Sequence, residues 1–509
     1  MQTGKKQIKT ALISVYHKDK LDGIVRLLNG YGVRIFSTGG TLKFIRDMGI
    51  EATAVESTTG FPEILDGRVK TLHPNIFGGI LARRDNTSDM KQLEQHGIDT
   101  IDLVIVDLYP FEDTVKNSTD EAEIIEKIDI GGISLIRAAA KNFNDTLIVS
   151  DRDQYQDLTS LLEDKKGYTD LEDRQVFAAK AFMTSSHYDT AIFSYFNKKA
   201  GLQAFRKSYT TAKTLRYGEN PHQKGVFFGD LNEIFDILHG KELSYNNLVD
   251  VEASLHLVAE FSEPTFAIVK HTNSCGLASR ETLKEAYMAA FACDTTSAFG
   301  GVLACNRTVD AETASEMNSL FFEVVTAPGY TDEALEILKQ KKNRIIIKLN
   351  KPVGNKIMFK SLLNGVLQQD VDWSSEKKED FKTVTEAKPS TEQMADLEFA
   401  IKAVKHLKSN GIALVKNRQL IGMGCGQTSR VDALESAIKK AAAFGFDTQG
   451  AVMASEAFFP FPDCVNIAGK AGIGAIAQPG GSIKDQESID EANRIGQAMV
   501  LTGIRHFRH

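Results

Sequence analysis

A lysine followed directly by a histidine stands out among the residues that could do chemistry. Lys270 and His271 follow the apolar run FAIV, which predicts a buried strand that ends at this pair. A lone histidine is more often a satisfied core residue, but burying a lysine without a partner is costly. Histidine exchanges protons near neutral pH, and a neighbouring ammonium stabilises developing negative charge. The pair is therefore a candidate for proton transfer.

The segment GRVKTLHP (67–74) concentrates cations in a short stretch of chain. Arg68 and Lys70 are two residues apart, so in a strand both side chains would point to one face. A solvated basic edge is the ordinary explanation for such a charge cluster. Glycines on both sides of the segment make a rigid, anion-facing loop a reasonable alternative.

Two short turns, SVYHK (14–18) and STGGT (37–41), each follow a predicted strand. In a parallel α/β sheet such turns lie at the carboxyl ends of the strands, where ligands bind. Glycine lets backbone N–H groups approach a phosphate, and the following helix N-terminus favours its charge. One such turn is usually only a connection, but two on adjacent strands indicate a phosphate site. The candidate residues are Ser14, Lys18, Ser37, Thr38, Gly39, Gly40 and Thr41.

A helix is predicted after the turn DIGG (129–132), which places Asp129 beside its N-terminus. Within the following RAAAK, Arg137 and Lys141 are four residues apart. This spacing is one helical turn, so both cations should lie on the same face.

Short aliphatic runs alternate with amphipathic stretches through residues 9–150, which is the pattern of an α/β layer. Residues 154–199 are predicted to be largely helical, and a polar stretch at 198–213 marks the first domain boundary. The predicted strands are 11–15, 33–36, 102–111 and 146–150, and the helices between them include 21–28 and 41–49.

The second half contains what resembles an internal repeat. FAIVKH (266–271) resembles IALVKN (412–417), and the Ala-rich helix, turn and strand of 283–305 resemble those of 433–455. Two such units packed as a pseudo-symmetric pair would bury surface that neither buries alone. A chance match between helix–strand units is the alternative. The charged stretch 374–393 between the copies is predicted to be a connector.

Length and composition exclude several classes of protein. A chain of 509 residues should divide into roughly three or four domains. The net charge of −7 argues against broad nucleic-acid binding, which needs a concentrated basic surface. No apolar run approaches the roughly 20 residues that cross a bilayer, and no secretory leader is expected, so the cytoplasm is the expected location.

The five cysteines include no CxxC pair and fit neither a disulfide framework nor a zinc ribbon. Cys275, close to the Lys-His pair, could be imagined as a nucleophile. Because nothing beside it marks a lowered pKa, we interpret it as a buried structural residue.

Together, GRVKTLHP, LYPF, DIGG and RAAAKN resemble a family of bifunctional purine-biosynthesis enzymes. In this family an aminoimidazole carboxamide ribonucleotide (AICAR) transformylase is joined to an IMP cyclohydrolase. The resemblance runs to the last residue of the chain. It implies an α/β fold, with a methylglyoxal-synthase-like parallel-sheet domain followed by two duplicated cytidine-deaminase-like α/β units. The implied domains are residues 1–200, 201–373 and 394–509, with 374–393 as connector.

The resemblance also implies an activity and partners. The enzyme would transfer a formyl group from the cosubstrate 10-formyltetrahydrofolate to AICAR and then close the ring to IMP with loss of water. Its partners would be nucleotide and folate molecules, not nucleic acid or membrane, and no metal is required. The family implies a homodimer with transformylase sites built across the interface.

For ring closure, the resemblance assigns roles to the N-terminal motifs. The carboxamide nitrogen is a poor nucleophile, so the site must move protons and stabilise an oxyanion. Two lysines are implied to flank the reacting groups, and which one donates a proton is left open. The turns at 14–18 and 37–41 would hold the 5′-phosphate. The implied catalytic residues are Lys70, Lys141, Tyr109 and Asp129, and Arg68 and Thr71 would position the substrate.

Some positions depart from the family pattern. Asp107 stands where the family more often has asparagine. If that side chain donated to the oxyanion, an ionised aspartate could not do so. Either it is partly protonated or the contact is dispensable. Tyr16 and His17 replace the more familiar Ser-Asp, and Ile133 replaces a proline.

For formyl transfer, His271 is implied to move the proton, with Lys270 as its electrostatic partner. Asn417 occupies the corresponding place in the second repeat and is implied to orient the formyl group. The segment SEAFFPFPD (455–463) fits either a folate-facing wall or a core strand and loop. The chain ends in TGIRHFRH (502–509), where Arg505, Phe507 and His509 match the terminal motif of the family. This motif is implied to fold into the nucleotide site rather than fray. Further implied contacts are Arg216, Tyr217, Asn247, Phe299, Gly300, Gln427, Ser429, Arg430, Phe458, Arg505 and His509.

Two other functional classes compete with this one. A zinc nucleobase deaminase would need an H-x-E or C-x-E motif with P-C-x-x-C, and the sequence has no such pair. A non-catalytic sensor of phosphate ligands would explain the two N-terminal turns. It would leave Lys270, His271, Asn417 and the terminal motif without a purpose.

Overall fold

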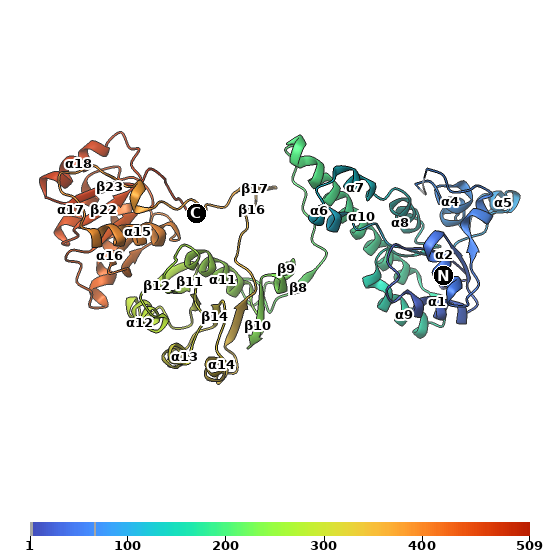
Figure 1. Cartoon of the computed structure of the whole chain (residues 1–509), viewed down its shortest axis with the longest axis horizontal. Helices are drawn as coiled ribbons and strands as arrows, with labels where there is room; N and C mark the ends of the chain where they lie inside the picture. Colours follow the sequence, from blue (N-terminus) through green and yellow to red (C-terminus); the bar gives the residue numbers. More distant parts are fainter. Residues whose placement is uncertain (1–3, 66–67) are drawn as a thin grey trace. The chain divides into compact units, whose positions relative to one another are not determined.

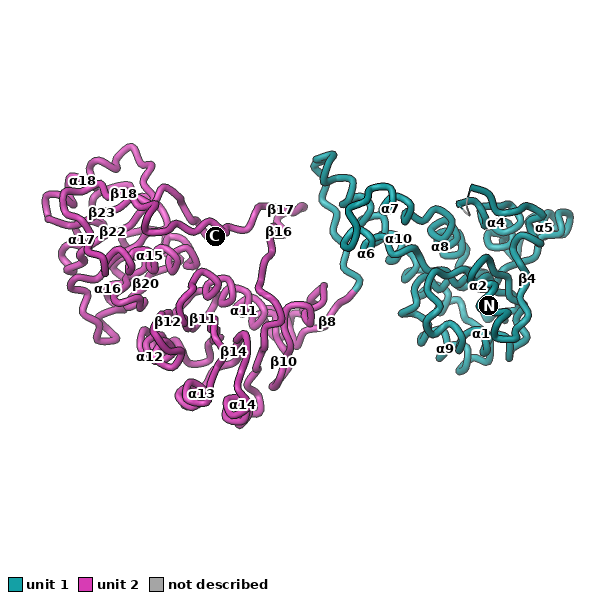
Figure 2. Tube along the Cα trace, viewed as in Figure 1, with its two compact units in different colours: residues 1–210 teal, residues 211–509 magenta. Residues whose placement is uncertain are grey.

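The computed structural model describes residues 4–65 and 68–509, so Gly67, the first residue of the basic segment, lies outside the described residues. The chain forms two compact units, the first ending at Thr210 and the second spanning Thr211–His509 (Figures 1 and 2). Each unit has its own sheet and its own core.

Unit 1 is built on a five-stranded parallel sheet with the order β4-β3-β2-β5-β6. The chain moves outward from β2 to β3 and β4, then returns to the other side of β2 with β5. The carboxyl ends of β2 and β5 therefore border the crevice where ligands bind in open α/β sheets. The strands are β2 (Thr10–Ser14), β3 (Arg34–Ser37), β4 (Thr53–Ala54), β5 (Leu103–Val106) and β6 (Leu147–Val149).

Alternating side chains of these strands enter two different cores. Ile13 and Ile105 belong to one buried cluster, whereas their neighbours Leu12 and Val104 belong to the other. Both faces of the sheet are thus covered, which explains the continuous apolar runs in the sequence. One face is covered by α1 (Leu21–Gly30), α2 (Gly39–Asp47) and α9 (Tyr155–Asp164), the other by α4 (Pro74–Leu81), α8 (Gly131–Lys141) and α10 (Leu171–Ala200).

The long helix α10 closes unit 1. Asp170 and Asp173 form a capping box at its N-terminus, and Gly201 ends it with a φ of 65°. The helical content expected for 154–199 is confirmed. The smaller elements of the unit are β1 (Lys6–Gln7), β7 (Tyr168–Thr169), α3 (Val55–Thr59), α5 (Thr87–Gln95), α6 (Phe111–Asn117) and α7 (Glu121–Glu126).

One strand is shorter than its sequence suggests. The expected strand 102–111 is strand only at Leu103–Val106. From Asp107 the chain turns into a loop, because that carboxylate binds backbone N–H groups of the first turn and Pro110 precedes helix α6. The apolar run therefore continues beyond the sheet.

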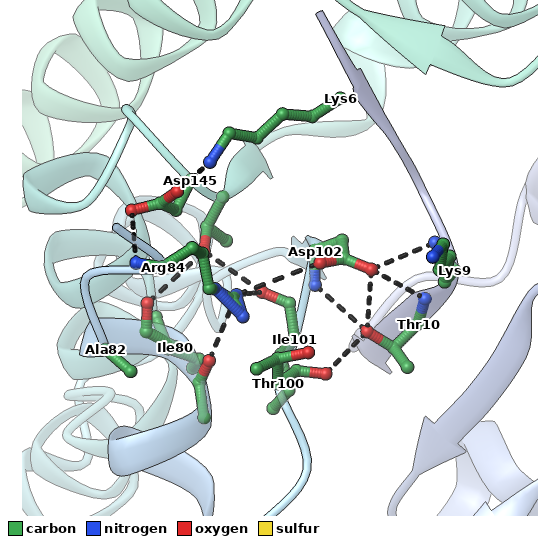
Figure 3. Close-up of polar contacts among 12 residues, drawn as sticks. Lys6, Lys9, Thr10, Ile80, Ala82, Arg84, Thr100, Ile101, Asp102 and Asp145 are labelled. Carbon is green, nitrogen blue, oxygen red and sulfur yellow. Dashed lines mark hydrogen bonds and ion pairs between the residues drawn. The ribbon is translucent and has the colours of Figure 1, made fainter. Parts of the chain in front are cut away.

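A polar network ties together the amino ends of the strands, away from the crevice (Figure 3). Asp102 accepts hydrogen bonds from the backbone N–H groups of Lys9 and Thr10 at 2.9 and 3.1 Å. Arg84 donates to the carbonyl of Ile101 at 2.9 Å and lies 3.8 Å from the Asp102 carboxylate. Lys6 and the backbone N–H of Arg84 both bind Asp145. These contacts fix β2 against β5.

Unit 2 contains a twelve-stranded sheet in which one topology occurs twice. In the first copy β12 and β13 are antiparallel to β11, and β14 and β15 continue parallel to β13. The second copy repeats this with β20, β19, β21, β22 and β23. The copies meet where β12 pairs with β20 through Ala278 and Gln419. The predicted internal repeat is confirmed.

The strands of the first copy are β11 (Thr265–Lys270), β12 (Asn273–Ser279), β13 (Val302–Cys305), β14 (Val324–Ala327) and β15 (Ile345–Leu349). Those of the second are β19 (Ile412–Lys416), β20 (Gln419–Gly424), β21 (Val452–Ser455), β22 (Ala475–Gln478) and β23 (Ala498–Leu501).

Each copy also has an antiparallel edge strand, β10 (Phe235–His239) beside β15 and β18 (Lys382–Thr383) beside β23. Strand β18 lies inside the stretch 374–393, so part of the expected connector joins the sheet of the second copy. Outside this sheet, β8 (Ala212–Thr214) pairs with β9 (Val226–Phe228), and β16 (Ile357–Leu362) forms an exposed hairpin with β17 (Gly365–Asp370).

The helices repeat as the strands do. Helices α11 (Tyr245–Val258) and α15 (Thr391–Lys405) contribute to a single apolar core that also holds strand residues of both copies. This shared core is the surface that neither copy would bury alone. The other face carries two separate cores, under α12 (Leu283–Cys293), α13 (Ala311–Met317) and α14 (Asp332–Leu338), and under α16 (Arg430–Ala443), α17 (Asp463–Lys470) and α18 (Asp485–Arg494).

Candidate active sites

A cavity of about 540 Å³ opens at the carboxyl ends of the strands of unit 1. Both predicted phosphate turns, the basic segment and the start of α8 contribute to its wall. Its lining includes Ser14, Tyr16, Lys18, Thr38, Gly39, Gly40, Thr41, Arg68, Lys70, Thr71, Asp107, Tyr109, Asp129, Gly131 and Gly132. Five segments that are distant in sequence thus meet at one place.

The two turns are joined by hydroxyl contacts. Ser14 Oγ lies 2.9 Å from Thr38 Oγ1, and Thr41 Oγ1 donates to the carbonyl of Val15 at 2.9 Å. Helix α2 begins at Gly39, and no side chain caps it. Its first backbone N–H groups are available to an anion in the cavity. A Cβ on Gly39 would lie 3.1 Å from Lys70 Nζ, so the lysine ammonium is at this turn.

Ser37 does not take part in this arrangement. Its hydroxyl donates to the carbonyl of Ile13 at 2.7 Å, and the residue is fully buried in the sheet. As the last residue of β3, it points into the sheet, whereas Thr38 faces the cavity. The prediction that Ser37 contacts the phosphate is not supported by this geometry.

Asp107 anchors the first turn. Its carboxylate accepts hydrogen bonds from the backbone N–H groups of Tyr16 and His17, the second at 2.9 Å. His17 Nδ1 lies 3.0 Å from the same carboxylate. An ionised carboxylate accepts all of these contacts, so its role here requires no donated hydrogen bond. The departures from the family pattern at Tyr16, His17 and Asp107 therefore contact one another.

The far wall is the N-terminus of α8. Asp129 is buried and accepts a hydrogen bond from Gly132 N at 2.6 Å. A Cβ on Gly132 would lie 2.6 Å from the Asp129 carboxylate, so the close approach requires glycine. Burial raises the pKa of Asp129. Burial and then the charge of Asp129 raise the pKa of Tyr109, which keeps the phenol protonated as a hydrogen-bond donor.

In its described part, residues 68–73, the basic segment is a loop, which is the alternative to a strand that its flanking glycines indicated. Its strand-like contact is one isolated bridge between Ile64 and Val69. Arg68 binds Glu126 through Nε at 3.2 Å and also through a terminal nitrogen, whereas Lys70 pairs with Glu63. Arg68 and Lys70 both line the cavity, and each is paired with a different glutamate.

Lys141 lies away from this cavity. It is the last residue of α8, an 11-residue helix whose first residues line the wall. A helix of that length spans about 15 Å, and the Lys141 side chain is exposed at its far end. Arg137, one turn earlier, is also exposed and lies over the Phe182 ring. Within one chain, the structure does not bring Lys70 and Lys141 to opposite sides of the cavity.

Tyr16 and Lys127 belong to the cavity region although sequence reasoning gave them no role. The Tyr16 and Tyr109 rings meet edge to face with centroids 5.5 Å apart. Lys127 Nζ lies 5.5 and 5.8 Å from these two ring centroids. Both pairings are tertiary, and the only sequence signal is that Lys127 lies two residues before Asp129.

In unit 2, Lys270 and His271 occupy the end of the hairpin β11–β12. His271 and Thr272 have φ values of 54° and 64°, and Asn417 and Arg418 in the second copy have 55° and 52°. Two adjacent residues with positive φ define the tight turn of a two-residue hairpin. Each turn is held by an aspartate from the preceding helix. Asp250 Oδ1 accepts from Thr272 N at 2.7 Å, and Asp396 accepts from Asn417 N at 2.8 Å.

Lys270 has a structural partner. Its Nζ donates to the carbonyl of Phe299 at 3.0 Å, and Lys416 of the second copy donates to the carbonyl of Gln449 at 2.7 Å. Gly300, with a φ of 73°, and the exposed Phe299 ring therefore lie beside the His271 turn. Lys270 is half-exposed, and the neighbouring His271 side chain is exposed.

The segment that carries the predicted contacts Arg216 and Tyr217 packs against the start of α11. Tyr245 N donates to the carbonyl of Tyr217, and Arg216 donates to the Tyr217 hydroxyl at 2.8 Å. Asn247 is buried, and its Oδ1 accepts from Ser244 in a capping box. The Asn247 side chain thus has a helix-capping role at the position predicted to bind substrate.

Several other predicted contacts are engaged within the protein. Arg430 is buried, with hydrogen bonds to Glu456 at 2.7 Å and Asn410 at 2.8 Å. Ser429 caps α16. Gln427 pairs through its backbone with Asn410. The Gln427 side chain is half-buried, and Arg430 supports the loop that carries it.

The segment 455–463 was predicted to be either a folate-facing wall or a core strand and loop, and its phenylalanines differ in burial. Phe459 is fully buried in the core, Phe458 is half-buried and Phe461 is exposed. A core strand and loop is therefore correct for Phe459, while Phe458 and Phe461 remain available to a ligand. Burial raises the pKa of the Cys275 thiol to about 12, which fits a structural residue.

His271 and Asn417 lie at opposite ends of the central hairpins. At the His271 end, Asn273 Oδ1 accepts from Lys408 N at 2.9 Å, beside the segments of Asn410 and Gln427. At the other end of β12, Arg280 donates to the carbonyl of Asn417 at 2.7 Å. The seven residues of β12 separate the two ends by about 20 Å. One chain therefore does not bring these two predicted catalytic side chains together.

The fold and its sites define an α/β enzyme with a parallel-sheet unit that carries a polar cavity and a duplicated second unit. Residues 20–134 match the model of the MGS-like domain, and residues 139–440 match the AICARFT/IMPCHase bienzyme. The chain belongs to the AICARFT/IMPCHase bienzyme family.

Two relatives share the whole length of the chain. "Bifunctional purine biosynthesis protein PurH" of Bacteroides thetaiotaomicron is 57% identical, with 99% of each chain covered. The protein of the same name from Acetivibrio thermocellus is 48% identical over 99% of this chain and 100% of its own. The solved structure titled "Crystal structure of ForH" is 35% identical over 37% of this chain and 96% of its own, with a TM-score of 0.33.

Within residues 4–65 and 68–509, no helix is long and apolar enough to cross a membrane. In the same part of the chain, no group of three or more His, Cys, Asp or Glu side chains is placed to hold a metal ion.

Proposed function

We propose that this chain carries both activities of its family. The formyl group of 10-formyltetrahydrofolate is transferred to AICAR, and the product is closed to IMP. Whole-length identity of 57% to a bifunctional purine biosynthesis protein is the observation that carries this assignment. We place the enzyme in the cytoplasm, and its small substrates need neither nucleic acid nor membrane.

Ring closure is assigned to the cavity of unit 1. The 5′-phosphate binds at the turns that contain Thr38 and Gly39, where the uncapped start of α2 and Lys70 favour an anion. The carboxamide nitrogen attacks the formyl carbon, a C–N bond forms, and the oxygen leaves as water. The oxygen must gain two protons to leave as water, and the attacking and formylated nitrogens lose them. Asp129 and Tyr109 line the cavity and are assigned to these proton transfers. Lys141 stays a prediction, and the rate of a Lys141→Ala enzyme tests it.

Formyl transfer is assigned to the His271 end of unit 2. The amine of AICAR attacks the formyl carbon, and His271 accepts the proton that the amine loses. The bond from that carbon to the folate nitrogen breaks, and this nitrogen takes up a proton to give tetrahydrofolate. Asn417 orients the formyl oxygen. Phe299, Phe458 and the terminal segment would surround the substrates at this end.

We propose further that the transformylase site is shared between two copies of the chain. His271 and Asn417 lie about 20 Å apart along β12 within one chain, so a site that uses both takes one residue from each copy. A two-fold axis would generate two such sites. The exposed hairpin β16–β17 offers apolar surface for this contact through Ile357, Met358, Leu362, Leu363 and Leu367.

The experiment uses two inactive variants of the full chain. His271→Ala and Asn417→Ala should each lose formyl transfer while retaining ring closure of formyl-AICAR. When subunits are exchanged between the two variants, half of the dimers are mixed, and each mixed dimer contains one intact site. Transformylase activity should return to about a quarter of the native value.

The control mixes two preparations of His271→Ala, which should stay inactive. Failure of the mixed variants to recover activity would contradict the shared site. Absence of IMP when native enzyme receives AICAR and 10-formyltetrahydrofolate would contradict the bifunctional assignment.

A further inference from the structure

The last residues of the chain alternate between inside and outside. His506 is buried and Arg508 is half-buried, whereas Arg505, Phe507 and His509 are exposed. This is the alternation of an extended chain that lies on a surface. The inward residues hold the terminal segment, and the outward residues are those implied to meet the nucleotide.

The backbone of the terminal segment is fixed at two places. His506 N donates to the carbonyl of Glu456, and Ser409 N donates to the carbonyl of Arg508 at 2.9 Å. Arg508 N donates to Ser409 Oγ at 3.0 Å. Ser409 precedes Asn410, which pairs with Gln427, so the segment lies at the His271 end of the unit.

His506 lies between two carboxylates. Nδ1 is 2.6 Å from Asp372, and Nε2 is 3.0 Å from Glu376, which is itself buried. Burial by itself lowers the pKa of His506, but the hydrogen bonds and charges of these two carboxylates raise it to about 9. The side chain is therefore an imidazolium at neutral pH, with both nitrogens donating.

The other ionisable groups near His506 pair with Glu260 or with backbone carbonyls. Lys405 Nζ binds Glu260 at 2.7 Å and the carbonyl of Ser374 at 2.6 Å. His406 Nε2 lies 3.0 Å from Glu260, and burial lowers the pKa of His406 to about 4, so it is neutral. Arg508 donates to the carbonyl of His406 at 2.6 Å. Asp372 and Glu376 are thus the carboxylates that hold His506.

We propose that His506 is a positioning residue for the transformylase reaction. Held between Asp372 and Glu376, it seats the terminal segment so that Arg505 and His509 face the nucleotide. The inference rests on the proposed role of the terminal motif in binding AICAR. If an unseated segment is productive only a tenth of the time, the apparent affinity for AICAR falls about tenfold.

The experiment measures both reactions of the full-length enzyme with His506→Gln. The KM for AICAR in formyl transfer should rise about tenfold, while kcat changes little. Ring closure of formyl-AICAR, which belongs to unit 1, should keep its native rate, and a native kcat for formyl transfer shows that unit 2 of the variant is folded. His239→Asn, a half-exposed histidine at the edge of the same sheet, is the matched control and should behave as native enzyme.

A pH profile separates positioning from a merely structural role. In native enzyme the KM for AICAR should rise as the pH passes about 9, where the imidazolium loses its proton. Glu376→Gln removes one carboxylate at the same side-chain shape, so this rise should move to lower pH. Asp372→Asn should move the rise in KM in the same direction. Because Asp372 is much more exposed than Glu376, this substitution disturbs folding less.

Three results would overturn the inference. They are a native KM in His506→Gln, unchanged pH profiles in both carboxylate variants, and a parallel fall of both activities. Arg505→Ala distinguishes this failure from a failure of the proposed function. If Arg505→Ala raises the KM but His506→Gln does not, only the positioning role is wrong, whereas a native KM in both contradicts the role of the terminal motif.

Discussion

At the cavity of unit 1, burial sets the chemistry of single side chains. The Asp129 carboxyl is removed from water, which favours its neutral form and raises its pKa. The pKa of the nearby Tyr109 hydroxyl is raised first by burial and then by the charge of Asp129, so the phenol stays protonated. Asp129 can accept a proton, and Tyr109 can donate a hydrogen bond. Loss of water during ring closure needs both functions. Asp107, in contrast, is fully used as an acceptor by the first turn.

The Asp129→Asn enzyme tests this assignment. An acid with a raised pKa takes up its proton at a higher pH than an exposed aspartate does, so native ring closure should lose rate earlier on the acid side. Asp129→Asn should lower kcat for ring closure by about 100-fold or more and remove that acid limb. The measurement is the pH dependence of IMP formation from formyl-AICAR. A variant that keeps both the native rate and the acid limb would refute the role.

At the scale of elements, carboxylates that are buried or half-buried hold turns and strand ends in place. Asp250 and Asp396 each bind the backbone of a hairpin turn, one in each copy of the repeat. Asp102 does the same for the amino end of β2 and partly compensates Arg84 (Figure 3). Such groups cannot be removed without leaving N–H groups unpaired, which costs more than the net energy of the hydrogen bonds they make.

Asp102→Ala should therefore destabilise unit 1. It leaves the N–H groups of Lys9 and Thr10 without this acceptor and Arg84 without its carboxylate, so the free energy of unfolding should fall by about 2 to 4 kcal/mol. Chemical denaturation followed by the loss of ring-closure activity gives the value. Asp99→Asn is the control, because its pair with Arg34 is half-exposed on both sides and should change stability by less than about 1 kcal/mol. Equal effects in the two variants would contradict the explanation.

At the scale of the whole molecule, the two proposed sites differ in what they need. The cavity of unit 1 is assembled from residues of one chain. The proposed transformylase site requires His271 and Asn417, which one chain keeps apart along β12. Ring closure should be independent of association, whereas formyl transfer should depend on it.

Dilution of the native enzyme tests this difference. As the protein concentration falls below the dissociation constant of the dimer, the specific activity of formyl transfer should fall and that of ring closure should stay constant. Both rates are measured on the same samples, with sedimentation reporting the oligomer. Formyl transfer that persists in a sample shown to be monomeric would place the whole site within one chain.

The sequence alone determined the features that depend on local spacing. Alternating apolar residues such as Leu12 and Ile13 specify the two faces of a sheet, glycine turns after strands specify where an anion can approach, and the similarity of FAIVKH to IALVKN specified the repeat. Tertiary structure decided which ends of those elements meet. Asn417 lies away from His271 because β12 and β20 join the two copies antiparallel. Ser37 faces the sheet, Lys141 lies at the far end of α8, and His506 meets Asp372 and Glu376 from more than 100 residues away. Distances of this kind are set by the pairing of whole strands and helices, which residue spacing along the chain does not contain.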